Sequence, residues 1–362
     1  MEFYRNAWNA LGDVGMWAFH EMRFYRNKGP YLQEDARAAE ASARLAAADY
    51  RKVERVRDID VRTFCSRYLA TSTPIIVADG CRDWRAKDAW TFDYFGAEFG
   101  DMQVQLQGQG FEKRDRVVLS SYLSSIAHQP PIQLGEQGAS VDYLRYTYGP
   151  RLEHLLFTWG FGSRVKTEHF TCAAYQRIAN DWALPYFLPD SDYRVPWVQA
   201  GKLQPNKRMC LDWGLYFSAP GARTRLHVDG TRTNAIICQI RGRKSGWLFS
   251  PDLEYAARQL AESGGAGAAG PADAAACAQG GGTIWRFDLE PGEIMLIPKG
   301  LAHEVITLAP SISMIYNFVT NAEYTDYYRQ MRERGPGWVA RAPIIDDPRF
   351  QAIVHAHAVA AT

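Results

Sequence analysis

The sequence lacks a surplus of charge of either sign and has few cysteines. Lysine and arginine together number 41, against 40 aspartate and glutamate residues, which leaves a formal net charge of +1. This balance argues against a general nucleic-acid or anionic-membrane surface, so a nucleic-acid partner is not expected. The six cysteines are scattered, and no two of them are separated by two residues. They indicate free thiols in a reducing compartment and argue against a disulfide framework or a cysteine zinc site.

Long apolar runs are also missing. No stretch approaches the roughly 20 apolar residues that a membrane-spanning helix needs. The N-terminal segment Met1–Asn6 contains an early glutamate, and no clean apolar core leads from it to a small-residue cleavage site. We therefore expect a cytoplasmic protein without membrane contact. Apolar and aromatic residues, in contrast, make up 47% and 13% of the chain, which is enough for a sizeable core.

Two stretches carry residues with metal-binding chemistry. The first, 224–230, contains His227 and Asp229 with one residue between them, and on a β-strand such residues point to the same face. An imidazole and a carboxylate on one face provide two ligands of a facial metal site. The third ligand is expected on a distant strand, and His303 is the candidate. It follows a turn, a short apolar run over 293–297 and a second turn.

The second stretch resembles a known motif. Four of its residues have the spacing of the second metal-binding motif of the cupin superfamily: Gly292, Pro298, Gly300 and His303. The segment 227–229 resembles the first motif of the jumonji-C branch, the Fe(II)- and 2-oxoglutarate-dependent oxygenases. The resemblance implies that His227, Asp229 and His303 bind Fe(II), with 2-oxoglutarate as cosubstrate and O2 at the remaining position. It also implies a mainly β fold with α additions, namely a double-stranded β-helix with N- and C-terminal helices.

The distal carboxylate of 2-oxoglutarate needs a buried cation, and Lys244 is the first candidate. Alternate residues before it are apolar, so an unbroken strand places Lys244 on the buried side, where an ammonium implies an anionic partner. A turn at Gly242 would reset this alternation. The segment 239–244 also resembles the jumonji segment that carries the cosubstrate-binding lysine. Arg225, which shares a face with His227 by parity, is the second candidate.

Three further residues match the family's cosubstrate site. Thr224 resembles the threonine that joins the distal carboxylate, although simple alternation puts it on the face opposite His227, so a β-bulge is required. Asn317 resembles an asparagine beside the iron, and Tyr143 a tyrosine that reaches the distal carboxylate. The alternative for all three is an ordinary polar role in a turn or strand. Thr307 stands where the cupin motif usually has asparagine.

We divide the chain into an N-terminal helical extension over 1–57, an oxygenase domain over 58–320 and C-terminal helices over 321–362. The extension includes an Ala-, Glu- and Arg-rich helix expected over 35–56. Within the domain, 150–200 is expected to form a cap-like insertion. The Gly- and Ala-rich segment 262–282 is expected to be a flexible loop, either a linker or a lid. Related hydroxylases dimerise through terminal helices, so a homodimer is expected.

The function implied is hydroxylation of an unactivated C–H bond, with release of succinate and CO2. The substrate would be a small molecule, a biosynthetic intermediate or a protein side chain. One alternative is a cupin-type isomerase or cosubstrate-free dioxygenase, whose sites more often use three histidines and have no need of Lys244. The other alternative is a non-catalytic barrel that binds a ligand.

Overall fold

The computed structural model describes residues 50–110, 113–136, 141–147, 177–178, 180–188, 193–194, 213–229, 233–251, 282–320 and 323. Most of the expected N-terminal extension, most of the cap-like insertion, nearly all of the Gly- and Ala-rich loop, and the C-terminal helices lie outside the described residues. Within the described residues, no helix is both long enough and apolar enough to cross a membrane.

Two β-sheets form the body of the protein. The larger has the order β2–β3–β13–β10–β15–β8–β6, with β7 paired beside β15, and the smaller has the order β1–β12–β11–β14–β9. The larger sheet consists of β2 (Glu54–Val56), β3 (Ile75–Val77), β6 (Leu144–Thr147), β7 (Tyr193–Arg194), β8 (Trp213–Ser218), β10 (Asn234–Arg241), β13 (Ile294–Ile297) and β15 (Ser311–Thr320). The smaller consists of β1 (Arg51–Lys52), β9 (Arg223–His227), β11 (Lys244–Phe249), β12 (Ile284–Leu289) and β14 (Ala302–Thr307).

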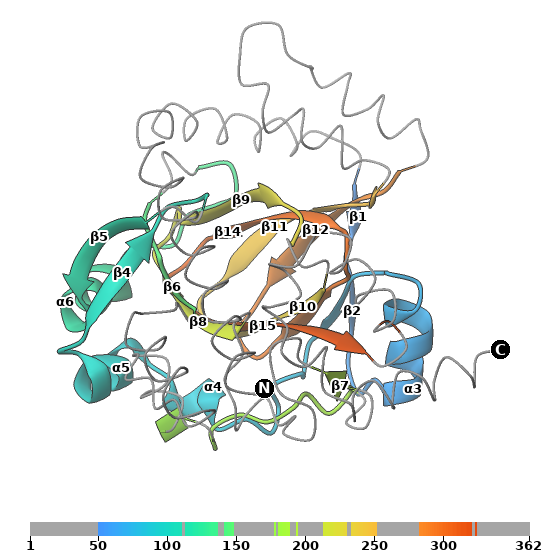
Figure 1. Cartoon of the computed structure of the whole chain (residues 1–362), viewed down its shortest axis with the longest axis horizontal. Coiled ribbons are helices and arrows are strands. Elements are labelled where there is room, and N and C mark those ends of the chain that lie inside the picture. The colour runs from blue at the N-terminus through green and yellow to red at the C-terminus, as the bar shows by residue number, and fades with distance from the viewer. Residues whose placement is uncertain are drawn as a thin grey trace, which may run out of the picture.

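The two sheets face each other as the walls of a barrel (Figure 1). Consecutive strands alternate between the walls: β8 lies in the larger sheet, β9 in the smaller, β10 in the larger and β11 in the smaller. The same alternation returns with β12 to β15, and all pairs among these eight strands within each wall are antiparallel. This is the double-stranded β-helix expected from the sequence.

Strand β10, in the middle of the larger sheet, is buried on both faces. On β10, Ile236, Cys238 and Ile240 belong to a core cluster shared with the helices outside the barrel, whereas Ala235 and Ile237 belong to a second cluster between the two sheets. Side chains that alternate along a strand point to opposite faces. A strand with apolar residues in both registers therefore forms the centre of the molecule, where it separates the two cores.

Short helices cover the outer face of the larger sheet (Figure 1). They are α3 (Val61–Thr63), continued by the π-helical segment η1 (Phe64–Leu69), then α4 (Ala86–Ala89), α5 (Phe92–Phe99) and α6 (Leu119–Ala127). At the start of α5 the side chain of Thr91 accepts a hydrogen bond from the Tyr94 amide. A separate hairpin of β4 (Gln103–Gln107) and β5 (Lys113–Val118) precedes α6.

The expectation of a helix up to residue 56 was wrong at its C-terminal end. Residues 51–52 form β1, which pairs in parallel with β12, and residues 54–56 form β2, which pairs in parallel with β3. Val53 lies between them, with its side chain buried in the core between the sheets. Pairing with two sheet edges overrides the helical propensity of this segment. The barrel therefore includes residues assigned to the helical extension.

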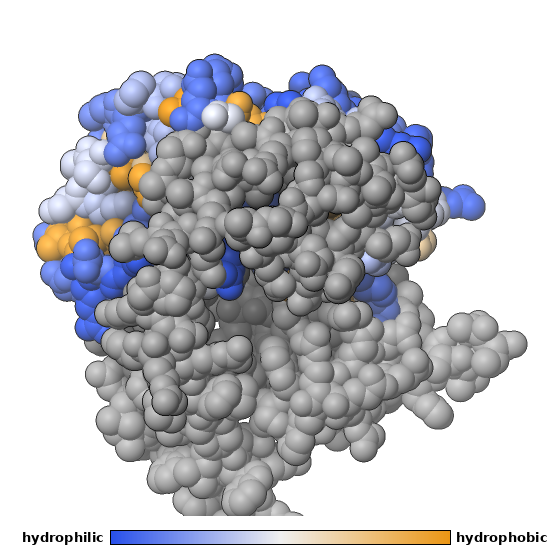
Figure 2. All heavy atoms as spheres, turned by 90° about the horizontal axis from the view of Figure 1, so that it is seen from above, coloured by the Kyte–Doolittle hydropathy of each residue, from blue (hydrophilic) through white to orange (hydrophobic). Residues whose placement is uncertain are grey.

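Viewed from above, the coloured residues along the rim of the molecule are mostly hydrophilic, with a few small apolar groups (Figure 2).

Candidate metal centre and cosubstrate site

Two histidines lie side by side on adjacent strands of the smaller sheet. His227 ends β9, His303 is the second residue of β14, and the two are direct partners in the antiparallel ladder. Their rings lie with centroids 4.2 Å apart and planes inclined by 53°. Residues that pair directly across neighbouring strands point to the same side of the sheet. Residues 76 positions apart in sequence are thereby brought to one point inside the barrel.

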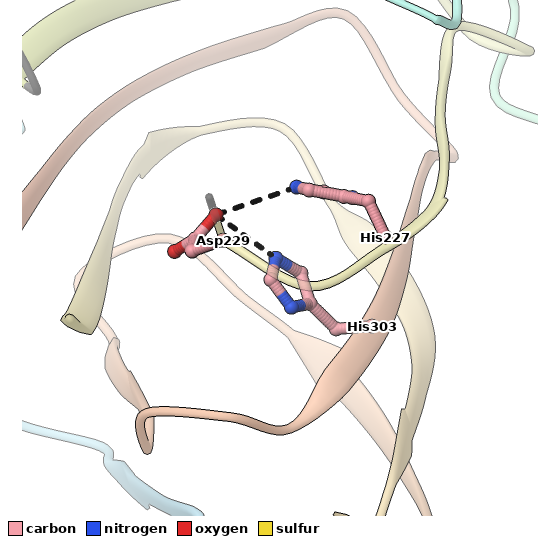
Figure 3. A group of neighbouring side chains, drawn as sticks. All are labelled: His227, Asp229 and His303. Atoms are coloured by element: carbon pink, nitrogen blue, oxygen red, sulfur yellow. Dashed lines mark ion pairs between the residues drawn. The ribbon is translucent and has the colours of Figure 1, made fainter. Parts of the chain in front are cut away.

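Asp229 completes the group from a position just beyond the end of β9. The expectation that His227 and Asp229 share one strand was wrong, because the strand ends at His227. Asp229 Oδ1 nevertheless lies 3.5 Å from His227 Nε2 and 4.0 Å from His303 Nε2. Figure 3 shows the carboxylate turned toward both rings. One ligand atom from each residue lies within 4.8 Å of the others.

Backbone carbonyls fix the orientation of both rings. The Nδ1 atom of His227 lies 2.8 Å from the carbonyl oxygen of Arg225, and that of His303 lies 3.1 Å from the carbonyl oxygen of Leu301. A carbonyl only accepts, so each neutral ring carries its proton on Nδ1. The Nε2 atoms, which then carry the lone pairs, lie on the side of Asp229. This is how histidines that bind metals are usually held.

The protonation states also suit a cation. Burial lowers the pKa of His303 to about 4, so its ring is neutral at physiological pH. Burial acts to raise the pKa of Asp229. The contacts with His227 and His303 and the amide of Asn317 outweigh this effect and hold that pKa well below its usual range. Two imidazoles and one carboxylate are the donor set of the facial sites that hold non-haem Fe(II).

Asn317 lies next to the centre, on β15 of the opposite sheet. Its Nδ2 donates to Asp229 Oδ2 at 2.7 Å and to Thr233 Oγ1 at 2.8 Å. Because Asn317 engages Oδ2, the other oxygen of Asp229 is the one that faces the histidines. The sequence suggested a place beside the metal for Asn317, and in the structure Asn317 contacts Asp229, a candidate metal ligand. Thr233 was not anticipated from the sequence.

Lys244 places a buried cation in the same barrel. Its side chain is only 5% exposed, and Nζ donates to Ser218 Oγ and Thr307 Oγ1, both at 3.1 Å. Burial lowers the pKa of Lys244 to about 7. Thr307 is four residues after His303 on β14, so the two side chains share a face and their Cα atoms lie roughly 13 Å apart along the strand.

The alternation argument for Lys244 was wrong, although the lysine is buried. Gly242 has φ +69° and lies in a turn between β10 and β11, so no single strand runs through to Lys244. The lysine instead opens β11, opposite Thr307. Its neighbours Ser218 and Thr307 were not assigned to the site from the sequence. The parity of Thr307 with His303 was the available signal, whereas nothing in the sequence placed Ser218 beside the lysine.

Thr224 and Tyr143 meet in the described structure, and Arg225 points elsewhere. The register of β9 against β14 shifts by one residue between the pairs His303–His227 and Val305–Thr224, which is the bulge that the assignment of Thr224 required. The hydroxyl of Thr224 donates to the buried Tyr143 hydroxyl at 3.3 Å. The side chain of Arg225 is exposed. Of the two candidate anchors, only Lys244 is buried.

Sequence comparisons agree with this geometry. Residues 61–256, more than half of the chain, match the cupin-like domain family. The chain belongs to this jumonji/cupin-like family. It is 24% identical over 297 residues to the arginine-specific demethylase JMJ20 of Arabidopsis thaliana, covering 74% of this chain and 57% of the relative. With the arginine-specific demethylase JMJ22 of the same plant it shares 21% identity over 280 residues, 75% of this chain and 46% of the relative.

Membership of the jumonji/cupin-like family confirms the resemblance read from the motifs, and these relatives support a 2-oxoglutarate-dependent oxygenase family. The chain spans about half the length of the curated relatives it matches. The segment matched to the family contains His227, Asp229 and Lys244 and ends before His303. The fold brings His303 to the other two ligands.

Proposed function

We propose that this protein is an Fe(II)- and 2-oxoglutarate-dependent oxygenase that hydroxylates a C–H bond of its substrate. The observation that carries the proposal is a pair of features in one barrel. A His–Asp–His group with converging donors shares a strand face with a buried ammonium, whose two partners in the described part of the chain are neutral hydroxyls. An unpaired buried ammonium is costly, so its retention favours an anionic ligand.

Each residue has a distinct role in this proposal. His227, Asp229 and His303 hold Fe(II) from one side, which leaves open positions for ligands. Lys244 binds the distal carboxylate of 2-oxoglutarate, and the hydroxyls of Thr224 and Tyr143 join it at the same carboxylate. The bound metal, cosubstrate and O2 supply an oxidant that converts C–H to C–OH, while 2-oxoglutarate becomes succinate and CO2. The chain positions the reactants and excludes water.

The test is succinate formation from 2-oxoglutarate under air, with Fe(II) added to metal-free protein. Wild-type protein should release succinate. Asp229→Ala should abolish the release because the facial ligand set is broken, and Lys244→Met should reduce it strongly because the distal carboxylate loses its cation. Iron-dependent oxidation without succinate would instead indicate a cosubstrate-free dioxygenase. A barrel that only binds a ligand would keep its ligand affinity in Asp229→Ala.

A second candidate reaction is demethylation of methylated arginine, which the names of the two plant relatives favour. Hydroxylation of an N-methyl group gives a carbinolamine that collapses to formaldehyde and the free amine, so the same site chemistry serves both outcomes. A methylarginine peptide distinguishes them by mass spectrometry. Demethylation removes the methyl group and releases formaldehyde in step with succinate, whereas stable hydroxylation adds one oxygen. The near-zero net charge favours a small-molecule or protein substrate over nucleic acid.

A further inference from the structure

Two adjacent residues at the start of β10 take part in contacts that lead to two of the candidate metal ligands. Thr233 Oγ1 accepts a hydrogen bond from Asn317 Nδ2, and the same nitrogen donates to Asp229 Oδ2. Thr233 therefore holds the amide of Asn317, and that amide in turn holds the carboxylate of Asp229. This is the first connection.

The second connection runs from Asn234 toward His303. The Oδ1 atom of Asn234 accepts a hydrogen bond from the backbone amide of Lys299 at 3.0 Å. Lys299 opens the turn that contains Leu301, whose carbonyl oxygen lies 3.1 Å from His303 Nδ1. The side-chain amide of Asn234 therefore fixes the segment that orients the His303 ring.

Glu323 closes the arrangement from the end of β15. Its Oε2 accepts hydrogen bonds from Asn234 Nδ2 at 2.8 Å and from the amide and hydroxyl of Thr320 at 3.2 and 2.8 Å. Its Oε1 lies 3.0 Å from Lys299 Nζ. Both ends of the Asn234 amide are thus occupied, so the side chain has one favoured orientation.

Burial makes these contacts rigid. Thr233 and Asn234 are 2% and 1% exposed. A buried polar group that loses its partner costs about 1–3 kcal/mol, so a satisfied buried network has one strongly preferred arrangement. Asn317 donates both hydrogens of its amide, to Asp229 and to Thr233. Without the Thr233 oxygen only the Asp229 carboxylate holds this amide, and the angle at which the amide meets Oδ2 is no longer fixed.

We propose that Thr233 and Asn234 are positioning residues of the metal centre, which set the orientation of Asp229 and its separation from His303. The inference rests on the proposed function insofar as it takes the His–Asp–His group to be a metal centre. It assigns a role to residues that contact neither the metal nor a substrate. Glu323 supports them by holding Asn234.

The test measures binding of Co(II) alone to metal-free protein, from its visible absorption, together with the melting temperature of the metal-free protein. Thr233→Val keeps the shape of the side chain and removes the acceptor. It should weaken Co(II) binding about tenfold, the size of effect seen when a group behind a metal ligand is lost. Thr233→Ser, which retains the hydroxyl, should bind within about twofold of wild type. Thr71→Val, at an exposed threonine hydroxyl bonded to the backbone of η1, is the matched control and should not alter binding.

Several results would overturn the inference. Folded Thr233→Val that binds Co(II) as wild type does would exclude a positioning role, and so would a Thr233→Ser protein as weak as Thr233→Val. If Thr233→Val does not fold, Glu323→Ala, which removes the acceptor of Asn234 Nδ2, decides. It lies at the edge of the network and should also weaken Co(II) binding, and an unchanged affinity would refute the proposal. Wild-type protein that binds no Co(II) would overturn this inference and the proposed function together, whereas the other outcomes leave the proposed function standing.

Discussion

At the scale of single residues, the protonation of Lys244 provides the most direct test of the proposed site. Its ammonium has only the hydroxyls of Ser218 and Thr307 as partners among the described residues, and burial lowers its pKa to about 7. A dianion bound beside it stabilises the charged form and raises this pKa. Binding of 2-oxoglutarate is therefore linked to uptake of a proton above pH 7.

This linkage gives a signed prediction. Below pH 7 the lysine is charged in the free and in the bound protein, so affinity should not change with pH. Above pH 7 the free protein must take up a proton to bind, and affinity should fall by up to about tenfold per pH unit. Calorimetric titration of 2-oxoglutarate into anaerobic, metal-loaded protein between pH 6.5 and pH 8.5 measures it. The proton uptake appears as a dependence of the observed enthalpy on the buffer. Affinity that stays constant across this range would show that Lys244 is not the anchor.

Residues of the site differ in how far sequence alone could find them. His227, Asp229 and His303 could be predicted because metal chemistry restricts the residue types, and turn residues mark their spacing. Thr233 and Asn234 could not, because their role depends on contacts with Asn317, Lys299 and Glu323, which lie far away in the chain. Threonine and asparagine occur at any turn or strand start, and nothing local marks these two.

At the scale of elements, strands of the barrel were predictable and their connections were less so. The apolar run over 293–297 predicted β13 to within one residue, and the resemblance to the cupin superfamily predicted the barrel around it. The sequence indicated that Gly242 could interrupt the strand before Lys244, but it did not show whether the chain turns there. Whether a glycine continues a strand or turns the chain depends on the partner, here the Ala309–Pro310 backbone against which it packs.

Gly242 allows a test of how the turn holds Lys244. Its φ of +69° favours glycine, and a Cβ there would lie 2.0 Å from the Pro310 carbonyl oxygen. Gly292 has a similar φ of +89°, but nothing lies within 4 Å of a Cβ at that position. Gly292→Ala should cost about 1 kcal/mol of unfolding free energy, from backbone strain alone. Gly242→Ala should cost roughly 2 kcal/mol more, because the Pro310 backbone must also move. Urea denaturation of both variants measures the difference, and equal costs would mean that the packing against Pro310 does not constrain the turn.

At the scale of the whole molecule, the N-terminal residues join the two walls of the barrel. One extended segment pairs with the edge strand β12 of the smaller sheet through β1 and with β3 of the larger sheet through β2. Composition suggested a helix there, because alanine, glutamate and arginine are good helix formers. The segment is a strand because two sheet edges are available to it, and such long-range pairing is not visible in the local sequence.

The proposed site also lowers the stability of the whole molecule, because it contains the buried ammonium of Lys244. The ordinary pKa of lysine is 10.5 and that of folded Lys244 is about 7, so folding is penalised as pH falls below 10.5, and the penalty is fully present below pH 7. Lys244→Met removes this charge with little change in volume. Ser218 and Thr307 keep each other as partners, because the Thr307 hydroxyl donates to Ser218 Oγ at 3.0 Å.

Metal-free Lys244→Met should therefore be more stable than wild type at pH 7, by roughly 1–4 kcal/mol, the gain seen when buried ion pairs are replaced by apolar groups. The gain should shrink as pH rises toward 10, where wild-type Lys244 is neutral in the folded protein and loses its penalty. Thermal denaturation of both proteins at pH 7 and pH 9.5 measures this dependence. A variant that is more stable yet releases no succinate would show that the buried ammonium is retained for ligand binding at the expense of stability. A variant less stable than wild type at pH 7 would mean that the hydrogen bonds of the ammonium outweigh its desolvation.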